Sequence, residues 1–370
     1  MTIVPNFTHE IGAHCESASL RDVLNWAGFP VSEPLVFGLD ATLGFAFIDN
    51  IAAGTQGMAQ DFLGGMPFFV GGKQGTITKN SLVCRVLGAI IDEQTFASAD
   101  KAWAAARNYI DAGQPLIICV DMYYLPYHST FHQFHFGRHA VALAGYDASR
   151  DVALVGDVEF ADLQEVPVED LKRARGSTFG GKYMGAHNTQ FAIQARPDGK
   201  HPPIAAGAKL AIQQEVKNML AASMSHEGVP ALRKFAASIR HWPERMEGKM
   251  AKNTLSQVYG YIEEYGTGGA IFRKLYLAFL EELLGNPDIV DSSAPRAWLP
   301  ADIALVEEVL PILSQDIDAW GSLGGQLKSA VDEGGEDCMS YLDLEQLAAE
   351  AESIAAREQE IFTRLSRLKI

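Results

Sequence analysis

Cys15 stands at a position in the sequence where a thiol can act as a nucleophile. The apolar residues between Leu20 and Ala27 are spaced by three and four residues, which predicts an amphipathic helix that begins near Cys15 and stops at Gly28. Unpaired backbone N–H groups and the positive end of the helix dipole favour the thiolate there, and the thiolate is the form that attacks carbonyl carbon. The alternative is an inert cysteine that belongs to the core.

A cysteine nucleophile needs an imidazole base and a group that orients the ring. Two segments that contain β-branched residues, 139–146 and 152–157, flank a turn and are predicted to pair as antiparallel strands. His139 begins the first strand and Asp157 ends the second, so their side chains are expected to lie together. The chain order of Cys15, His139 and Asp157 is that of a papain-like enzyme; the alternative for Asp157 is an ordinary aspartate at a strand end.

Four histidines between His128 and His139 are spaced by four, three and four residues, a spacing that would align them for a divalent metal on one helix. Pro126, Gly137 and the many aromatic residues of this stretch do not suit a helix, and they predict a loop that lines a pocket. We therefore predict no metal site. The chemistry of a cysteine nucleophile requires no cofactor.

The composition argues against several classes of protein. Thirty basic and 46 acidic residues give a formal charge of −16, shared by both halves of the chain, which argues against nucleic acid as a partner. The basic residues Lys172, Arg173 and Arg175 are interpreted as a solvated helix face, with docking of an acidic carrier protein as the alternative. We find no membrane-spanning apolar run and no basic secretion leader, and the four cysteines are scattered, so a reducing, cytoplasmic location is predicted.

The elements that must position these residues fall into two regions. Strand and helix patterns mix in the first region and the second reads almost entirely as helix, which predicts an α+β domain followed by an all-α domain. Proline and glycine interrupt the intervening stretch, so we predict a catalytic domain at 1–196, a linker at 197–207 and a helical domain at 208–370. Apolar residues between Leu344 and Leu368 form a heptad seam, interpreted as a packed helical hairpin, with a homodimer contact as the alternative.

Several motifs resemble a known family. The residues that carry the resemblance in the first domain stand at 7–21, 32–33, 37–39, 121–128, 135, 139 and 145–147. They are similar to the N-terminal domain of the butirosin biosynthesis protein H family, and residues 266–276 resemble the helical domain of unknown function that often follows it. The resemblance implies a papain-like cysteine acyltransferase fold, related to bacteriocin-processing peptidases and found among natural-product assembly enzymes.

The resemblance also implies roles for particular residues. Cys15 would hold the acyl group and His139 would relay the proton, while Asp157 follows from the papain-like pattern. Related peptidases have a glutamine six residues before the cysteine that helps to form the oxyanion hole. This sequence has His9 there, so His9 and the backbone N–H of Cys15 are the expected oxyanion donors. Four side chains of the following segment are expected to bind substrate or the oxyanion: Asp121, Tyr123, Tyr124 and His135.

The predicted function is that of a cytoplasmic acyltransferase in secondary metabolite biosynthesis. It would move an acyl or aminoacyl group from an acyl carrier protein, or from another acyl thioester donor, through Cys15 to an amine or hydroxyl group of a small-molecule acceptor. A cysteine hydrolase (amidase, peptidase or thioesterase) remains an alternative, because water can replace the acceptor without any change in the catalytic residues. A non-catalytic binding module on the same fold is the alternative from another class.

Overall fold

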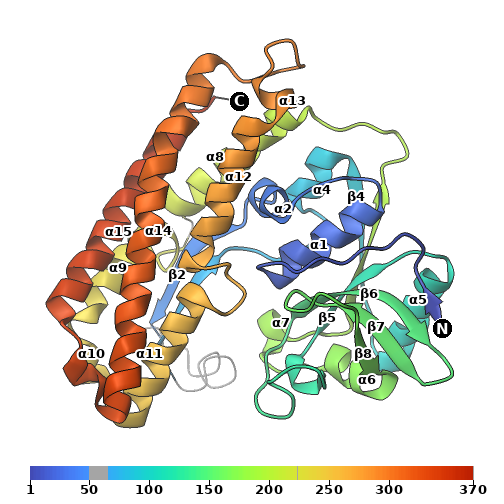
Figure 1. Ribbon diagram of the computed structural model, residues 1–370, viewed down its shortest axis with the longest axis horizontal. Helices are drawn as coiled ribbons and strands as arrows, with labels where there is room; N and C mark the ends of the chain where they lie inside the picture. Colours follow the sequence, from blue (N-terminus) through green and yellow to red (C-terminus); the bar gives the residue numbers. More distant parts are fainter. Residues whose placement is uncertain (50–65, 223, 370) are drawn as a thin grey trace. The chain divides into compact units, whose positions relative to one another are not determined.

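The computed structural model describes residues 1–49, 66–222 and 224–369. The chain forms two compact units, and each is built from two separate stretches of sequence (Figure 1). The first unit comprises Met1–Val36 and Thr76–His201, and the second comprises Phe37–Gly75 and Pro202–Ile370. All the predicted site residues belong to the first unit.

An antiparallel sheet forms the centre of the first unit. Among the residues that the structure describes, this sheet has seven strands in the order β4-β9-β5-β6-β7-β8, with β1 paired to β6. The strands are β1 (Thr2–Ile3), β4 (Ala89–Thr95), β5 (Leu116–Val120), β6 (His139–Asp147), β7 (Val152–Gly156), β8 (Gln164–Pro167) and β9 (Thr189–Ala195). Every residue of β5 and β6 is buried, so both faces of the sheet are covered at its centre.

The first unit also contains several helices. They are α1 (Cys15–Trp26), α4 (Leu82–Leu87), α5 (Ala99–Asp111), the 3-10 helix η1 (Met122–Tyr124), α6 (Val168–Gly176) and α7 (Gly181–Met184). α1 packs against β5 and β6, while α5 and α6 share a buried apolar core with β5, β6 and β7. α1 begins at Cys15, as the apolar spacing predicts, and Gly28 follows its C-terminus with a φ of 90°, a left-handed conformation that favours glycine.

The end of β5, the start of β6 and the end of β7 meet at one end of the sheet. Val120, the last residue of β5, pairs with His139, and Gly156, the last residue of β7, also pairs with β6. Because antiparallel neighbours run in opposite directions, Asp121 and Asp157 leave the sheet near the point where His139 enters it. The strand register therefore gathers three of the predicted site residues.

The second unit is mainly helical. Its helices are α8 (Ile204–Leu220), α9 (Gly228–Ile239), α10 (Trp242–Arg245), α11 (Gly248–Glu263), η2 (Ala270–Phe272), α12 (Arg273–Gly285), α13 (Pro287–Val290), α14 (Pro300–Gly334), η3 (Gly335–Tyr341) and α15 (Leu344–Leu365). It also contains the antiparallel hairpin of β2 (Leu43–Asp49) and β3 (Phe68–Lys73), and α2 (Glu33–Leu39) spans the first change of unit along the chain. None of the described helices has the length and apolar character needed to cross a membrane.

A buried ion pair and packed aromatic rings hold the second unit together. Arg273, 1% exposed, donates twice to the carboxylate of Glu358 at 2.8 Å, and the indole N–H of Trp320 donates to the same carboxylate at 3.1 Å. Glu358 is the polar member of the predicted heptad seam. The seam lies on α15, which packs against α8, α9 and α14 of the same chain (Figure 1), so this contact is satisfied within the chain.

The structure confirms a mixed α/β fold with a helical C-terminal region, and it differs from the prediction in one segment. Residues 37–75 cluster with the second unit rather than with a continuous domain at 1–196, because the β2–β3 hairpin packs its phenylalanine rings against α9 and α10. The second unit is therefore not all-α. The later change of unit, between His201 and Pro202, falls inside the stretch 197–207.

Candidate active site

Cys15 is the first residue of α1, and a buried carboxylate holds the chain around it. The preceding residue, His14, is the N-cap residue in an extended conformation, and its side chain makes no capping hydrogen bond. The carboxylate of Glu33 binds the chain around the helix start: it accepts from the backbone N–H groups of Ala13 and His14, which precede the helix, and from the Ser17 hydroxyl, each at 2.8 Å. Glu33 therefore orders the backbone that presents the thiol.

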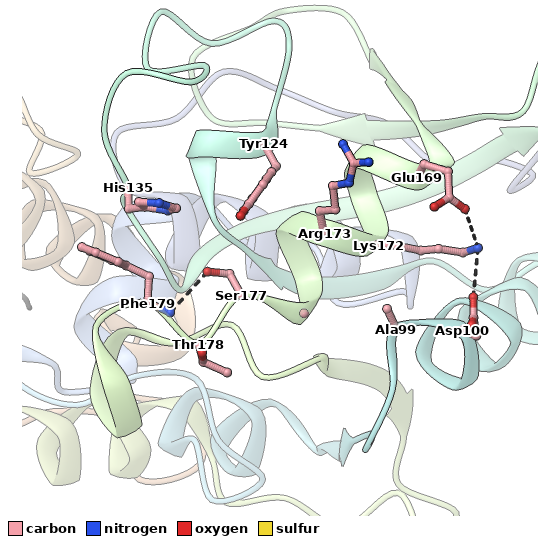
Figure 2. Close-up of a pocket in the computed structure, with 11 residues that line it drawn as sticks. Ala99, Asp100, Tyr124, His135, Glu169, Lys172, Arg173, Ser177, Thr178 and Phe179 are labelled. Atoms are coloured by element: carbon pink, nitrogen blue, oxygen red, sulfur yellow. Dashed lines mark hydrogen bonds and ion pairs between the residues drawn. The ribbon is translucent and has the colours of Figure 1, made fainter.

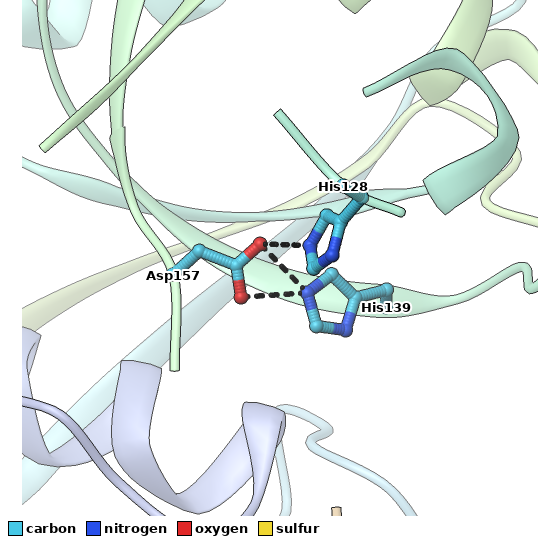
Figure 3. A group of neighbouring side chains, drawn as sticks. All are labelled: His128, His139 and Asp157. Carbon is cyan, nitrogen blue, oxygen red and sulfur yellow. Dashed lines mark hydrogen bonds and ion pairs between the residues drawn. The ribbon is translucent and has the colours of Figure 1, made fainter. Parts of the chain in front are cut away.

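Cys15, His139 and Asp157 form one contiguous group of side chains. The Nε2 atom of His139 lies 2.8 Å from Oδ1 and 2.9 Å from Oδ2 of Asp157 (Figure 3). The side chains of Cys15 and His139 are near enough that each shifts the pKa of the other. Because Nε2 faces the carboxylate, Nδ1 is the ring nitrogen that remains for the sulfur. The structure thus joins His139 to Asp157 and places Cys15 beside them, as the sequence predicts; the catalytic roles of the three residues stay a prediction.

The charges in this group favour a thiolate beside an imidazolium. Burial alone lowers the pKa of His139, but the carboxylate of Asp157 and the Cys15 side chain raise that pKa well above its ordinary value. Burial raises the pKa of Cys15, whereas the charge of His14 and the hydrogen bond with His139 lower it, and the net pKa is below that of an ordinary thiol. Burial also disfavours ionised Asp157, yet His139 and His128 hold the pKa of its carboxyl far below the usual range.

Cys15 differs from the other three cysteines. All four are free thiols, but Cys15 is partly exposed whereas Cys84, Cys119 and Cys338 are buried. Burial raises the pKa of Cys119 to about 12 and also raises that of Cys338. Cys15 combines access to solvent with a stabilised thiolate, as a nucleophile requires.

Asp157 has two further partners that the sequence reasoning missed. The Tyr127 hydroxyl donates to Oδ2 at 2.7 Å, and His128 Nε2 lies 2.9 Å from the same oxygen. The His128 ring is 5% exposed and meets the His139 ring edge to face, at 5.5 Å between centroids (Figure 3). The sequence contained one signal for these two partners of Asp157. Tyr127 and His128 directly follow Pro126 and precede His139, in a segment that was expected to line a pocket.

The same three side chains have the composition of a metal site. His128 Nε2, His139 Nε2 and a carboxylate oxygen of Asp157 lie within 4.8 Å of one another, and two imidazoles with a carboxylate suit a divalent transition metal. The separations of 2.8 to 2.9 Å between each nitrogen and the carboxylate are those of charge-assisted hydrogen bonds. Hydrogen bonding to one ionised carboxylate therefore accounts for the convergence of both rings.

His9 has a different role from the expected one. Its Nδ1 lies 2.6 Å from Asp22 Oδ2, and its Nε2 lies 3.1 Å from the carbonyl oxygen of Asp157 and 2.9 Å from that of Phe160. Burial lowers the pKa of His9, but Asp22 and the two carbonyls raise it above its ordinary value, which favours an imidazolium that donates from both nitrogens. No N–H of His9 is left for an oxyanion, so we correct its role to that of holding the segment that carries Asp157.

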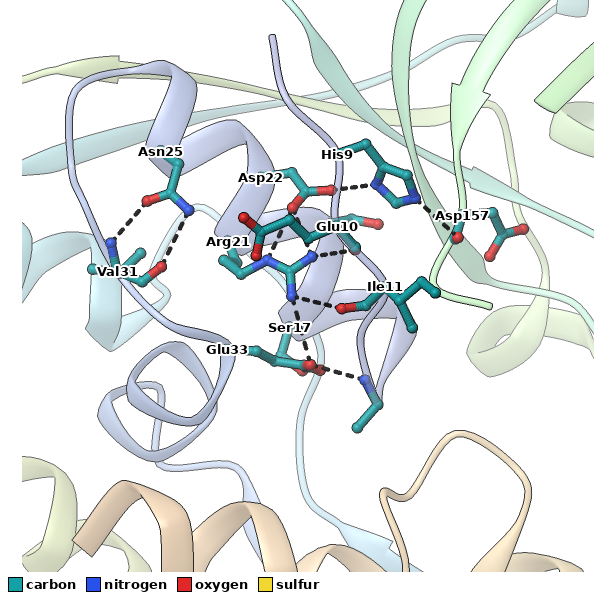
Figure 4. A network of polar contacts seen from close by, with 12 residues as sticks. His9, Glu10, Ile11, Ser17, Arg21, Asp22, Asn25, Val31, Glu33 and Asp157 are labelled. Atoms are coloured by element: carbon teal, nitrogen blue, oxygen red, sulfur yellow. Dashed lines mark hydrogen bonds and ion pairs between the residues drawn. The ribbon is translucent and has the colours of Figure 1, made fainter. Parts of the chain in front are cut away.

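A buried network connects His9 to the start of α1. Arg21 donates to Asp22 Oδ1 at 2.7 and 2.9 Å, and it also donates to the carbonyl oxygens of Glu10 and Ile11 (Figure 4). Arg21 lies 3.9 Å from the carboxylate of Glu33. The network therefore fixes the segment before Cys15 from one side and the segment after β7 from the other.

The other predicted binding residues form a separate cluster around Asp121. One oxygen of this fully buried carboxylate accepts from His135 Nδ1 at 2.7 Å and from the Ser177 hydroxyl at 2.6 Å, and the other accepts from the backbone N–H of Tyr123 at 3.1 Å. Tyr124 and His135 line an open cavity, whereas Asp121 lies behind them. The structure brings these four residues together, and within the described part of the chain no hydrogen bond joins them to the sulfur of Cys15.

The small basic group is largely neutralised within the first unit. Lys172 lies 3.0 Å from Asp100 and 2.8 Å from Glu169, and Arg175 is 1% exposed and donates to Gln190. Arg173 alone is well exposed, at 62% of its side chain. This arrangement favours a helix face with local ion pairs over a docking site for an acidic protein.

Two family models match the sequence. Residues 14–158 match the model described as Butirosin biosynthesis protein H, N-terminal, and residues 169–293 match the model described as Domain of unknown function (DUF4872). The first match includes Cys15, His139 and Asp157. No curated protein matches the sequence.

Proposed function

Since residues 14–158 form a butirosin biosynthesis protein H N-terminal region, followed by the domain of unknown function, we propose that this chain is a cysteine-dependent acyltransferase of secondary metabolism. The family name links the first region to the biosynthesis of a secondary metabolite. The observation that carries the acyltransferase proposal is the buried imidazole of His139, which the Asp157 carboxylate holds at 2.8 Å and which lowers the pKa of the Cys15 thiol.

The first half of the proposed cycle loads the enzyme. Nδ1 of His139 takes the thiol proton, and the Cys15 thiolate attacks the carbonyl carbon of an acyl thioester. The backbone N–H of Cys15, in the first turn of α1 where no intrahelical acceptor exists, is the oxyanion donor that remains from the prediction. The tetrahedral intermediate collapses, the donor thiol leaves with the proton from His139, and the acyl group is bonded to Cys15.

The second half of the proposed cycle transfers the acyl group from Cys15 to the acceptor. An amine or hydroxyl group of a small-molecule acceptor gives its proton to His139 and attacks the acyl-Cys15 carbonyl. The bond to sulfur breaks, the amide or ester product leaves, and the thiolate–imidazolium pair is restored. Asp157 stabilises the imidazolium in both halves, and the cycle includes no redox step. The donor is an acyl carrier protein or another acyl thioester.

Two features support a papain-like assignment and transfer rather than hydrolysis. The nucleophile begins a helix, while the base and the acid come from adjacent antiparallel strands, as in papain-like enzymes. His139 is 4% exposed and Asp157 is fully buried, which limits the access of bulk water to the base. Hydrolysis of an acyl substrate through Cys15, with the same three residues, is the second candidate. A binding module without catalysis is the third.

The experiment is intact-mass spectrometry after incubation with a panel of N-acetylcysteamine acyl thioesters and a panel of amines and alcohols. We expect a mass increase of one acyl group on Cys15, absent in Cys15→Ala and retained in the matched control Cys338→Ala. The adduct should persist in buffer and discharge when an acceptor is added. Discharge to free acid at a rate that no acceptor changes would support the hydrolase, and no adduct with any thioester would support the binding module.

A further inference from the structure

An open cavity of about 680 Å³ lies in the first unit beside the loop of residues 121–138. Its walls come from this loop, from the start of α5, from α6 and from the segment that follows α6 (Figure 2). The same loop carries Tyr127 and His128, which bind the carboxylate of Asp157. The cavity and the Cys15–His139–Asp157 group therefore share one structural element, although the chemistry proposed above uses no atom of the cavity.

The loop presents a rigid hydrogen-bond acceptor to this cavity. Asp121 receives the Nδ1 proton of His135, so the neutral ring has its lone pair on Nε2. The ring is stacked between Tyr123 and Phe179, with centroids 4.1 and 4.4 Å away, and its side chain is 28% exposed. Stacking on both faces and the bond to a buried carboxylate fix the direction of Nε2.

A donor lies next to this acceptor. The ring of Tyr124 meets that of His135 at 6.0 Å, and its hydroxyl points toward the open centre of the cavity (Figure 2). In the part of the chain that the structure describes, no hydrogen bond reaches the Tyr124 hydroxyl or the Nε2 atom of His135. A hydroxyl group or a neutral amine can donate to one and accept from the other with a single atom, whereas a carboxylate or a carbonyl oxygen only accepts.

The charges on the wall do not select an anion. Lys172 is held between Asp100 and Glu169, so its charge is already compensated. Arg173 faces solvent and lies 3.4 Å from Asp170. The lining thus contains two carboxylates and two cations, and the phenol of Tyr124 and the imidazole of His135 are uncharged groups left for a ligand.

We propose that this cavity is the subsite for the acceptor, and that Tyr124 and His135 bind an amine or hydroxyl group of the acceptor other than the one that attacks acyl-Cys15. The assignment rests on the proposed acyl transfer, because it gives that reaction its second substrate. Asp121 is a positioning residue that sets the proton of His135. The ligand class is a small polar molecule that carries amino or hydroxyl groups.

A binding experiment tests the cavity without the chemistry of Cys15. The probe is 2-amino-1,3-propanediol, with propionate as an acceptor-only control of similar size, and the readout is the Nε2 resonance of His135 in long-range 1H–15N NMR. We expect the amino alcohol to shift this resonance and propionate to leave it in place. Tyr124→Phe and His135→Asn, whose amide can still donate to Asp121, should weaken probe binding at least about fivefold, or roughly 1 kcal/mol. The matched variants Tyr341→Phe and His241→Asn, on the second unit, should leave it unchanged.

A kinetic experiment links the cavity to turnover. Two rates are measured in Tyr124→Phe: the formation of acyl-Cys15 and its discharge by the acceptor. The discharge rate divided by the formation rate should fall at least about fivefold, equivalent to roughly 1 kcal/mol. Equal discharge in wild type and Tyr124→Phe, or an unshifted His135 resonance at up to about 100 mM probe, far above the usual range of specific ligands, would overturn the assignment. Failure to form any acyl-Cys15 overturns the proposed function instead, and the binding result then decides whether the cavity binds amino alcohols for another purpose.

Discussion

The thiolate of Cys15 depends on residues that act on it from two directions. His139 provides a hydrogen bond and a positive charge, and His14 adds charge from the preceding position, while burial opposes both. His139 in turn keeps its proton because Asp157 is ionised beside it. The reactivity of one sulfur therefore reports the state of the whole group.

Alkylation of the cysteines against pH should reveal this pair. Cys15 should react with iodoacetamide at pH values below the ordinary thiol pKa of about 8.5, because its own pKa is lowered. Its rate should rise with pH through the lowered pKa and then level off. Cys119, with a pKa of about 12, should stay unreactive near neutrality. In His139→Gln the rate at pH 6 should fall at least about tenfold, since the thiolate loses its partner.

Peptide mapping of the alkylated protein measures each site separately. The matched variant His241→Asn, in an exposed position of the second unit, should leave the Cys15 profile unchanged. Equal rates at Cys15 and the buried cysteines, or a profile that His139→Gln does not move, would contradict the nucleophile assignment.

His128 should act as a positioning residue through Asp157. His128→Ala removes a buried hydrogen bond to a carboxylate, and such a bond contributes about 1.5 to 3 kcal/mol. We expect the low-pH alkylation of Cys15 to slow by about tenfold, because a less well held Asp157 supports the His139 imidazolium less well. His128→Gln, whose amide can still donate, should restore most of the rate. Equal loss in both variants would point to packing of the ring rather than hydrogen bonding.

The sequence predicted the three central residues of the site because local features place each of them. Cys15 follows from a helix start, and His139 and Asp157 follow from the two ends of a hairpin. The contacts of His9 could not be predicted in this way, because they bridge 148 and 151 residues of chain to carbonyl groups that carry no residue-specific signal. The bond of His128 to Asp157 depends on the path of an irregular loop, which apolar spacing does not encode.

At the scale of elements, the start of α1 is fixed from outside the helix. The side chain of its N-cap residue makes no capping hydrogen bond, and Glu33, from the start of α2, holds the backbone of Ala13 and His14 just before the helix. The spacing of apolar residues predicted where α1 begins. That spacing contained no information on the contacts of Glu33, because they join two helices across a loop.

Removal of this acceptor should loosen the start of α1. Glu33→Ala leaves two partly buried N–H groups and a buried hydroxyl without their partner, at a cost of about 1 to 3 kcal/mol. We expect hydrogen–deuterium exchange of the peptide around residues 13–20 to accelerate by about tenfold or more, and Cys15 alkylation to slow. Glu10→Ala is the matched control, since this exposed residue uses only its backbone carbonyl in the network. Unchanged exchange in Glu33→Ala would show that other contacts hold the helix start.

At the scale of the whole molecule, each unit draws on two stretches of sequence. The hairpin of β2 and β3 comes early in the chain but packs among helices that follow residue 202. The sequence-based prediction groups segments that are adjacent in the chain. The predicted domain at 1–196 therefore included this hairpin. Long-range aromatic packing, which is visible only in three dimensions, decides the assignment.

The second unit also buries a carboxyl group without a cationic partner of its own. Burial raises the pKa of Glu215 well above its ordinary value of about 4.5, and Tyr276, Arg273 and the backbone near Leu43 only partly oppose this effect. A folded-state pKa above the unfolded value stabilises the fold fully at low pH, and this contribution is lost as pH rises through the folded-state pKa. The fold of this unit should therefore weaken toward alkaline pH.

Glu215→Gln should remove that loss, since glutamine carries no proton to release. We expect the stability of Glu215→Gln relative to wild type, measured by the midpoint of urea unfolding, to be greater at pH 8 than at pH 4.5. The difference should be equivalent to about 1 kcal/mol or more, because a shift of one pKa unit is worth about 1.4 kcal/mol. The comparison between two pH values cancels the cost of burying the amide itself, and the raised pKa of Asp316 is common to both proteins. Glu281→Gln, at an exposed position, is the matched control and should give no such change. If the difference between Glu215→Gln and wild type stays constant from pH 4.5 to pH 8, Glu215 titrates in the folded protein as it does in the unfolded chain, and its burial does not contribute to the pH dependence of the fold.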